Sequence, residues 1–217
     1  MKTTLKSVLT STALIIASAS LTATSVSAAT SNELALQGFT GSQSSFKLTR
    51  PASAPAKCAP KAGGYARVTG GEEAELLEVF VWGLPKNSEV DVFSIQVPGA
   101  PFGMSWYIGD IQTDAKGKGY ARYIGRFNKE TFIVAPNAAV ATEVHDHPIA
   151  DANVNPSTAP IHTYHLGVWF NSPKDAKAAG CSNAVTPFNG DHTAGIQVLN
   201  TGTFPDTAGP LLNATQP

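Results

Sequence analysis

Residues 76–82 have the sequence LLEVFVW, a run rich in β-branched and aromatic side chains, and Gly83-Leu84-Pro85 follows it. Such a run is typical of a β-strand, because these side chains pack well on a pleated surface and because glycine and proline end it. A second run of this kind, GYARV at 64–68, precedes the Thr-Gly-Gly segment at 69–71. The two runs predict a pair of strands joined around that turn.

Segments of the same kind recur along the chain at short, regular intervals. Turn residues such as Pro-Gly and Asp-Ala-Lys-Gly separate them, and no strand-helix-strand alternation is visible. We predict an all-β fold, an antiparallel β-sandwich of about eight or nine strands, in which 104–126 form a hairpin. The further expected strands are 46–49, 89–97, 104–112, 119–126, 131–136, 161–170 and 195–200.

One short helix is predicted at 173–179. Ser172 is a good N-cap, Pro173 suits the first turn, Asp175 stands three residues after the cap and Gly180 can end the helix. The pattern therefore gives a sandwich with one short helix.

The first 29 residues have the pattern of a secretory signal peptide. Lys2 and Lys6 precede a moderately apolar stretch centred on 13–17, and small residues follow it up to Ala28 and Ala29. The apolar run is shorter than the roughly 20 residues that span a bilayer. We expect cleavage near Ala28 or Ala29, a secreted or periplasmic protein, and no stable membrane insertion after cleavage.

The composition divides the remaining chain and limits its partners. We expect a flexible Ser/Ala/Pro-rich lead-in at 30–60, the sandwich domain at 61–205 and a C-terminal tail at 206–217. Loss of Lys2 and Lys6 leaves 13 of the 15 basic residues against 16 acidic ones, a net charge of −3. A mildly acidic chain gives no electrostatic reason to expect nucleic acid as a partner.

Two cysteines, Cys58 and Cys181, remain in a chain that is expected to reach an oxidising compartment. Pairing is then the simplest outcome, so we predict a disulfide between them, with two separate buried thiols as the alternative. A zinc site built on these cysteines is less favoured, because neither lies in a C-x-x-C pair.

Histidines gather in the C-terminal half of the chain, and they are the candidate metal ligands. Residues two apart share a face of an extended segment, so His145 and His147 can reach one ion, whereas only one of His162 and His165 faces the same way. His192, beside an Asn-Gly turn, could add a ligand. Such a donor set would suit zinc or copper, and no other cofactor is indicated. The alternatives are histidines that hydrogen-bond to turns and water, or that act as a general acid or base.

The order of these histidines resembles that in the copper/zinc superoxide dismutases. An H-x-H pair at His145 and His147 is followed about fifteen residues later by His162, on an exported sandwich. The resemblance implies a metal-dependent enzyme, in which the H-x-H strand supplies copper ligands and the later histidine bridges the metals. It covers about a tenth of the chain, and the remaining zinc ligands of that family have no counterpart here.

Aromatic residues offer a different function. Trp106, Asp110 and Gln112 are expected on one face of a strand, where a tryptophan could stack on a sugar ring beside polar groups, as in a carbohydrate-binding module. In a sandwich most rings are expected in the core. The aromatic residues considered are Trp82, Trp106, Tyr107, Tyr120, Tyr123, Tyr164 and Trp169.

No catalytic motif accompanies these candidates. The chain lacks a G-x-S-x-G elbow, an H-E-x-x-H helix and a phosphate-cradling glycine loop. Whether the protein is an enzyme stays open, and this lack favours a non-catalytic module. The sequence thus predicts an exported non-catalytic sandwich of unidentified ligand, with a zinc- or copper-binding protein and a carbohydrate-binding module as alternatives. A glycan or protein partner is left open.

Overall fold

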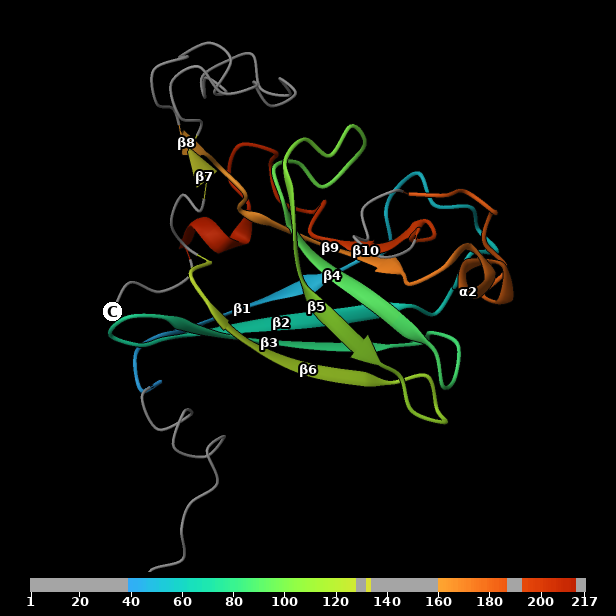
Figure 1. Cartoon of the computed structure of the whole chain (residues 1–217), viewed down its shortest axis with the longest axis horizontal. Helices are drawn as coiled ribbons and strands as arrows, with labels where there is room; N and C mark the ends of the chain where they lie inside the picture. Colours follow the sequence, from blue (N-terminus) through green and yellow to red (C-terminus); the bar gives the residue numbers. More distant parts are fainter. Residues whose placement is uncertain (1–38, 128–131, 134–159, 187–192, 214–217) are drawn as a thin grey trace, which may run out of the picture.

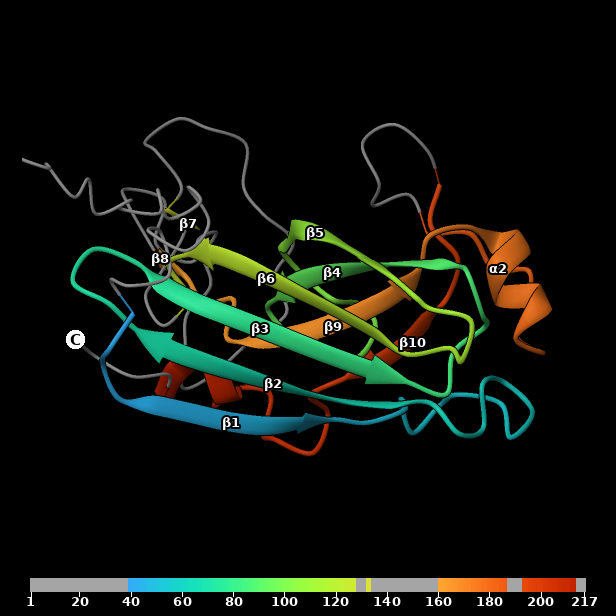
Figure 2. The same ribbon diagram turned by 90° about the horizontal axis from the view of Figure 1, so that it is seen from below.

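The computed structural model describes residues 39–127, 132–133, 160–186 and 193–213, and it is an antiparallel β-sandwich with one short α-helix (Figure 1). The predicted fold class is therefore confirmed. Two four-stranded sheets pack face to face, as Figure 2 shows from below. No helix among the described residues is long and apolar enough to cross a membrane.

The first sheet has the strand order β1-β2-β3-β6. Its central pair is the one expected around the glycine turn, with Thr69 opposite Leu76 and Tyr65 opposite Phe80. Side chains alternate between the two faces of β3, and Leu77, Val79 and Val81 on one face are buried between the sheets. The strands are β1 (Gln43–Leu48), β2 (Gly63–Gly70), β3 (Glu75–Trp82) and β6 (Gly119–Gly125).

The second sheet has the order β10-β9-β4-β5. Strands β4 and β9 lie at its centre and direct Val92, Val168 and their neighbours into the core. A small separate pair, β7 (Phe132–Ile133) and β8 (Pro160–Ile161), also pairs antiparallel. The strands of the second sheet are β4 (Glu89–Ile95), β5 (Ser105–Gln112), β9 (His165–Phe170) and β10 (Gln197–Asn200).

The expected hairpin at 104–126 is wrong. Its turn forms, with a bridge between Thr113 and Gly119, but β5 pairs with β4 and β6 pairs with β3. The two strands therefore separate into different sheets at the edge of the sandwich. The physical reason is that β5 forms a full hydrogen-bonded ladder with β4, and β6 forms one with β3, whereas only one bridge joins the two segments to each other.

The opposite edge of the sandwich is also tied together. Thr49, directly after β1, exchanges two backbone hydrogen bonds of 2.8 Å with Asn200 at the end of β10. Phe46 and Leu48 of β1 are buried in the core. This strand lies within the segment that the composition assigned to the lead-in, so the sandwich as described includes residues before 61.

The predicted disulfide is confirmed, with Cys58 bonded to Cys181 across a sequence separation of 123 residues. The predicted helix is α2 (Pro173–Ala178), and the Ser172 side chain accepts a hydrogen bond of 3.1 Å from the Asp175 N–H. The disulfide joins the segment before β2 to the residues that follow α2, at one end of the sandwich (Figure 1).

Candidate functional site

Aromatic side chains cover part of the outer face of the first sheet. Because Leu77, Val79 and Val81 of β3 point into the core, the alternate residues Phe80 and Trp82 point outward. Phe80 is half-buried, whereas 43% of Trp82 is exposed. Together with Tyr65 of β2 and Tyr120 of β6, they form what we call the aromatic platform.

Three of these rings form a row across neighbouring strands. The centroid of Phe80 lies 4.6 Å from that of Tyr65 and 4.4 Å from that of Tyr120. Phe80 therefore has a ring against each of its faces, and such cross-strand pairs stabilise a sheet by roughly 0.2–1 kcal/mol each. Tyr120 stands on the edge strand β6, and 45% of it is exposed. Tyr120 is the end of the row that a ligand can reach.

Trp82 lies flat on the sheet, unlike the three stacked rings. Three atoms of its indole lie 2.8–2.9 Å from the point where a Cβ on Gly63 would stand. These nearly equal distances place the face of the indole against the backbone of Gly63, which a larger residue would prevent. The other face of the ring is therefore directed away from the sheet, as a stacking surface needs.

A charged network holds Tyr120 in place. Glu78 of β3 accepts a hydrogen bond of 2.6 Å from the Tyr120 hydroxyl and another of 2.6 Å from Arg67 Nε of β2. Partial burial, followed by this bond to Glu78, raises the pKa of Tyr120 to about 12. Glu78 itself is buried and serves as the acceptor between two strands, so the phenol stays protonated over the physiological range.

The platform lies in a shallow groove of about 860 Å³, a volume typical of ligand sites. Polar residues border it on the side of the β5–β6 turn. All of its lining residues are within the described ranges. They are Lys61, Tyr65, Phe80, Val81, Trp82, Gly83, Gln112, Asp114, Lys116, Lys118, Gly119 and Tyr120.

The β5–β6 turn is held in one conformation. The Asp114 carboxylate accepts hydrogen bonds from the backbone N–H groups of Lys116 (2.7 Å) and Lys118 (2.9 Å), and these bonds lower the pKa of Asp114 below its usual value. Gly117 has a φ of 69°, and a Cβ there would lie 2.0 Å from the Leu84 carbonyl oxygen. The turn therefore places two lysines at the groove by backbone bonds.

The predicted ligand-binding pair Trp106 and Asp110 does not share a face. The pairing of β4 with β5 shifts register between Val92 and Phe93, so the alternation along β5 is interrupted before Asp110. Tyr107 shares the face of Asp110 instead, and its hydroxyl donates a hydrogen bond of 2.6 Å to that carboxylate. Partial burial and this bond raise the pKa of Tyr107.

Trp106 is 56% exposed and lines a separate, smaller pocket of about 290 Å³ near the end of β6. Tyr123, which lines the same pocket, donates a hydrogen bond of 3.0 Å to the backbone carbonyl of Asp110. Burial raises the pKa of Tyr123. The expected sugar site on β5 is thus divided between two surfaces.

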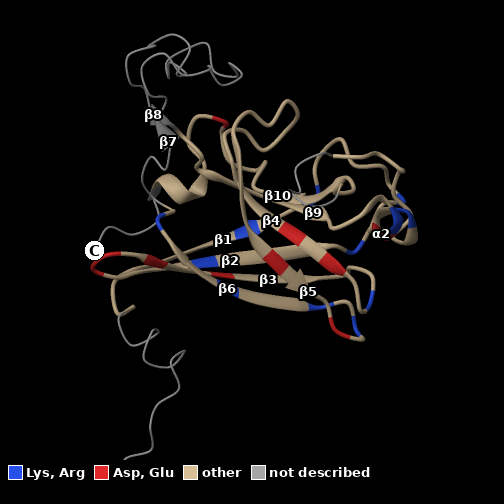
Figure 3. Ribbon diagram, in the orientation of Figure 1, with Lys and Arg blue, Asp and Glu red and all other residues tan. Residues whose placement is uncertain are grey.

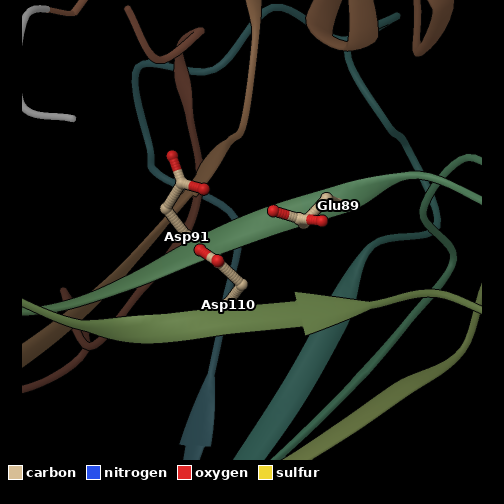
Figure 4. Close-up of side chains that lie close together, drawn as sticks. All are labelled: Glu89, Asp91 and Asp110. Carbon is tan, nitrogen blue, oxygen red and sulfur yellow. The ribbon is translucent and has the colours of Figure 1, made fainter. Parts of the chain in front are cut away.

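Three carboxylates gather on the outer face of the second sheet (Figure 4). Glu89 and Asp91 are two apart on β4, and Asp110 stands directly opposite Asp91 on β5. One oxygen of each lies within 4.8 Å of the others, a spacing at which carboxylates could hold a hard cation. Glu89 is half-buried, Asp91 is fully buried and Asp110 is exposed. The only sign of this cluster in the sequence is a pair of acidic residues two apart in a predicted strand.

Two of the five candidate metal ligands lie among the described residues. His165 is fully buried, with Nδ1 2.9 Å from the Thr201 hydroxyl and Nε2 3.2 and 3.1 Å from the carbonyl oxygens of Pro205 and Asp206. A nitrogen facing carbonyl oxygens must donate its proton, so Nε2 is no metal ligand in this arrangement. These contacts hold the 201–206 segment against β9.

His162 is half-buried, and its ring stacks on Tyr164 at a centroid distance of 5.2 Å. Its Nδ1 lies 3.1 Å from the Tyr164 hydroxyl. His145, His147 and His192 lie outside the described residues, so the zinc or copper site stays a prediction. Within the described ranges, the acidic cluster is the only group of three potential metal ligands in mutual reach.

Comparison of the chain with protein-family models, with curated proteins and with solved structures finds no match. The candidate function therefore depends on the residues of the groove. Among these, Tyr65, Phe80 and the three lysines were not singled out from the sequence, and Trp82 and Tyr120 were included among rings expected mostly in the core. The signal that identifies Phe80 and Trp82 is their alternation with Glu78, a charged residue that marks the outward face of β3.

Proposed function

We propose that this chain is an exported, non-catalytic β-sandwich module that binds a glycan in the groove of the first sheet. The observation that carries the proposal is Trp82, whose indole lies flat over Gly63 with 43% of the residue exposed. A flat, exposed indole can stack on the apolar face of a sugar ring, and Tyr120 provides a second ring at the sheet edge.

Several features support a binding role. Gln112 and Asp114 border the aromatic rings, as polar groups that orient a ligand do in most sites. Backbone hydrogen bonds and cross-strand stacking hold the groove, so little conformational entropy is lost when a ligand binds. The disulfide and the signal-peptide pattern of residues 1–29 support export to an oxidising compartment.

The test is a glycan microarray probed with protein that begins at residue 30, followed by affinity measurements on any glycan that binds. Trp82→Ala should weaken binding by about tenfold or more, as loss of a central tryptophan anchor does. Trp106→Ala is the matched control, because Trp106 is exposed to a similar degree but does not line this groove. It should bind as wild type does.

Gly63→Ala probes the platform without removing the ring. Its new methyl group would stand 2.8–2.9 Å from the indole atoms, so the ring must tilt away from the sheet. We expect weaker glycan binding together with a shift in tryptophan fluorescence. An array without hits contradicts the proposal, and so does a loss of binding in Trp106→Ala with none in Trp82→Ala.

A further inference from the structure

The groove of the first sheet has an excess of positive charge. Lys61, Lys116 and Lys118 line it and are exposed, whereas Asp114 is the only acidic residue of the lining. The three lysines form no salt bridge within the described part of the chain. Their charges are therefore available to a ligand.

The acidic side chains close to these lysines are already engaged. Asp114 accepts the backbone bonds of the β5–β6 turn, and Glu78 binds Arg67 and Tyr120. Asp114 lies beside Lys116 and Lys118 and offsets part of their charge, so three cations and one anion line the groove. Figure 3 shows basic segments on β1, β2, β6 and the β5–β6 turn, and acidic segments on β4 and β5 as well as on β3, at the β2–β3 turn and in the β5–β6 turn.

Lys61 and the β5–β6 turn, which holds the other two lysines, both pack against the backbone of Gly83 and Leu84. Lys61 stands just before β2, and a Cβ on Gly83 would lie 2.0 Å from the Lys61 carbonyl oxygen. The Leu84 N–H donates a hydrogen bond of 3.2 Å to the carbonyl of Gly117, between the other two lysines. Close backbone packing thus fixes the Cα position of each lysine beside the aromatic platform.

We infer that the groove takes an anionic polysaccharide, whose sugar ring stacks on Trp82 and whose carboxylate or sulfate groups lie among Lys61, Lys116 and Lys118. The inference rests on the proposed glycan function and names the class of glycan. A neutral glycan offers these exposed ammonium groups only hydroxyl oxygens, whereas an acidic one forms stronger, charge-assisted hydrogen bonds with them. Lysine is a compact charge without fork geometry, so either carboxylate or sulfate can be accepted.

Nucleic acid is the other common polyanion, and the groove fits it less well. Only three cations line the groove, and Asp114 and Glu78 stand among the basic residues of this face, so no continuous basic stripe follows a phosphate backbone. A single flat indole with polar neighbours suits one sugar ring. Binding to DNA is therefore an outcome that the test must examine.

The experiment measures binding of three polysaccharides by affinity electrophoresis and calorimetry: polygalacturonate, its fully methyl-esterified form, and dextran sulfate. The protein begins at residue 30. We expect binding to at least one acidic polymer and weaker binding to the neutral ester. The double variant Lys116→Gln with Lys118→Gln removes two exposed ion pairs with the acidic polymer. Its affinity for that polymer should therefore fall by about tenfold at low salt. The loss should shrink as salt rises.

The matched control is Lys174→Gln with Lys177→Gln. Both residues are exposed on α2 and neither lines the groove, so this variant has the same net charge with the groove intact. It should bind as wild type does.

The outcomes separate the two proposals. Equal binding of the ester and the acid, with no effect of Lys116 and Lys118, overturns the anionic class but leaves the glycan function. Equal losses in the two double variants also overturn the inference. Single-stranded DNA that binds as well as polygalacturonate, with the same dependence on Lys116 and Lys118, overturns the polysaccharide class. If no glycan of any charge binds, both proposals fail.

Discussion

His165→Ala tests whether His165 has a structural or a metal-binding role. His165 has no exposed surface, and its ring bridges β9 to Thr201 and to the carbonyl oxygens of Pro205 and Asp206. Removing the ring deletes hydrogen bonds to the part-buried carbonyl groups of Pro205 and Asp206, at about 0.5–1.5 kcal/mol each, and adds the cost of a cavity at a fully buried position. We expect the free energy of unfolding to fall by about 3 kcal/mol, with and without added zinc or copper.

Urea denaturation followed by tryptophan fluorescence and circular dichroism measures this loss. His165→Gln should lose less, because its amide can still donate toward the carbonyl groups. His162→Ala is the comparison, since His162 is half-buried and stacks on one ring, and it should lose about 1 kcal/mol or less. A loss for His165→Ala below 1 kcal/mol, or one seen only when metal is present, would refute the structural role.

Three further predictions concern the fold. Replacing Cys58 and Cys181 together by alanine should lower the free energy of unfolding by up to about 5 kcal/mol, because the disulfide closes a loop with a separation of 123 residues; equal urea midpoints would contradict this. Ser172→Ala should cost about 1 kcal/mol in the same assay through loss of the N-cap bond to Asp175. Because the folded pKa of Tyr120 is raised to about 12 from 10, its contribution is present below pH 10 and declines as the pH rises toward 12; Tyr120→Phe should show a shallower decline than wild type.

The fold was largely predictable from the sequence, for an identifiable reason. Alternation in LLEVFVW, turn residues between short runs, and the Ser172 cap are local signals, and each led to an element that the structure contains. The prediction of a hairpin at 104–126 was wrong because β5 and β6 pair with strands that are distant in sequence, each in a different sheet. A local sequence pattern predicts that a turn forms, but it does not predict with which other strand each of the two flanking strands will pair.

The site was harder to predict, because it depends on register. One shift in the pairing of β4 with β5 separates Trp106 from Asp110, and its only local signal is Gly109, which stands at the shift with a φ of 154°. The stacked row requires Tyr65, Phe80 and Tyr120 to be directly opposite one another on three strands, which the sequence of any one strand does not contain. The indole of Trp82 needed a glycine on the neighbouring strand.

The net charge also concealed the chemistry of the groove. The chain from residue 30 onward has a charge of −3, which by itself argues against an acidic ligand. The three carboxylates at Glu89, Asp91 and Asp110 are on the outer face of the second sheet, whereas the lysines are at the groove of the first. Gln112 of the groove stands directly opposite Glu89, but the lining itself contains three lysines and one acidic residue. A ligand in the groove therefore meets mainly the lysines, and its binding should weaken with salt although the whole protein is acidic.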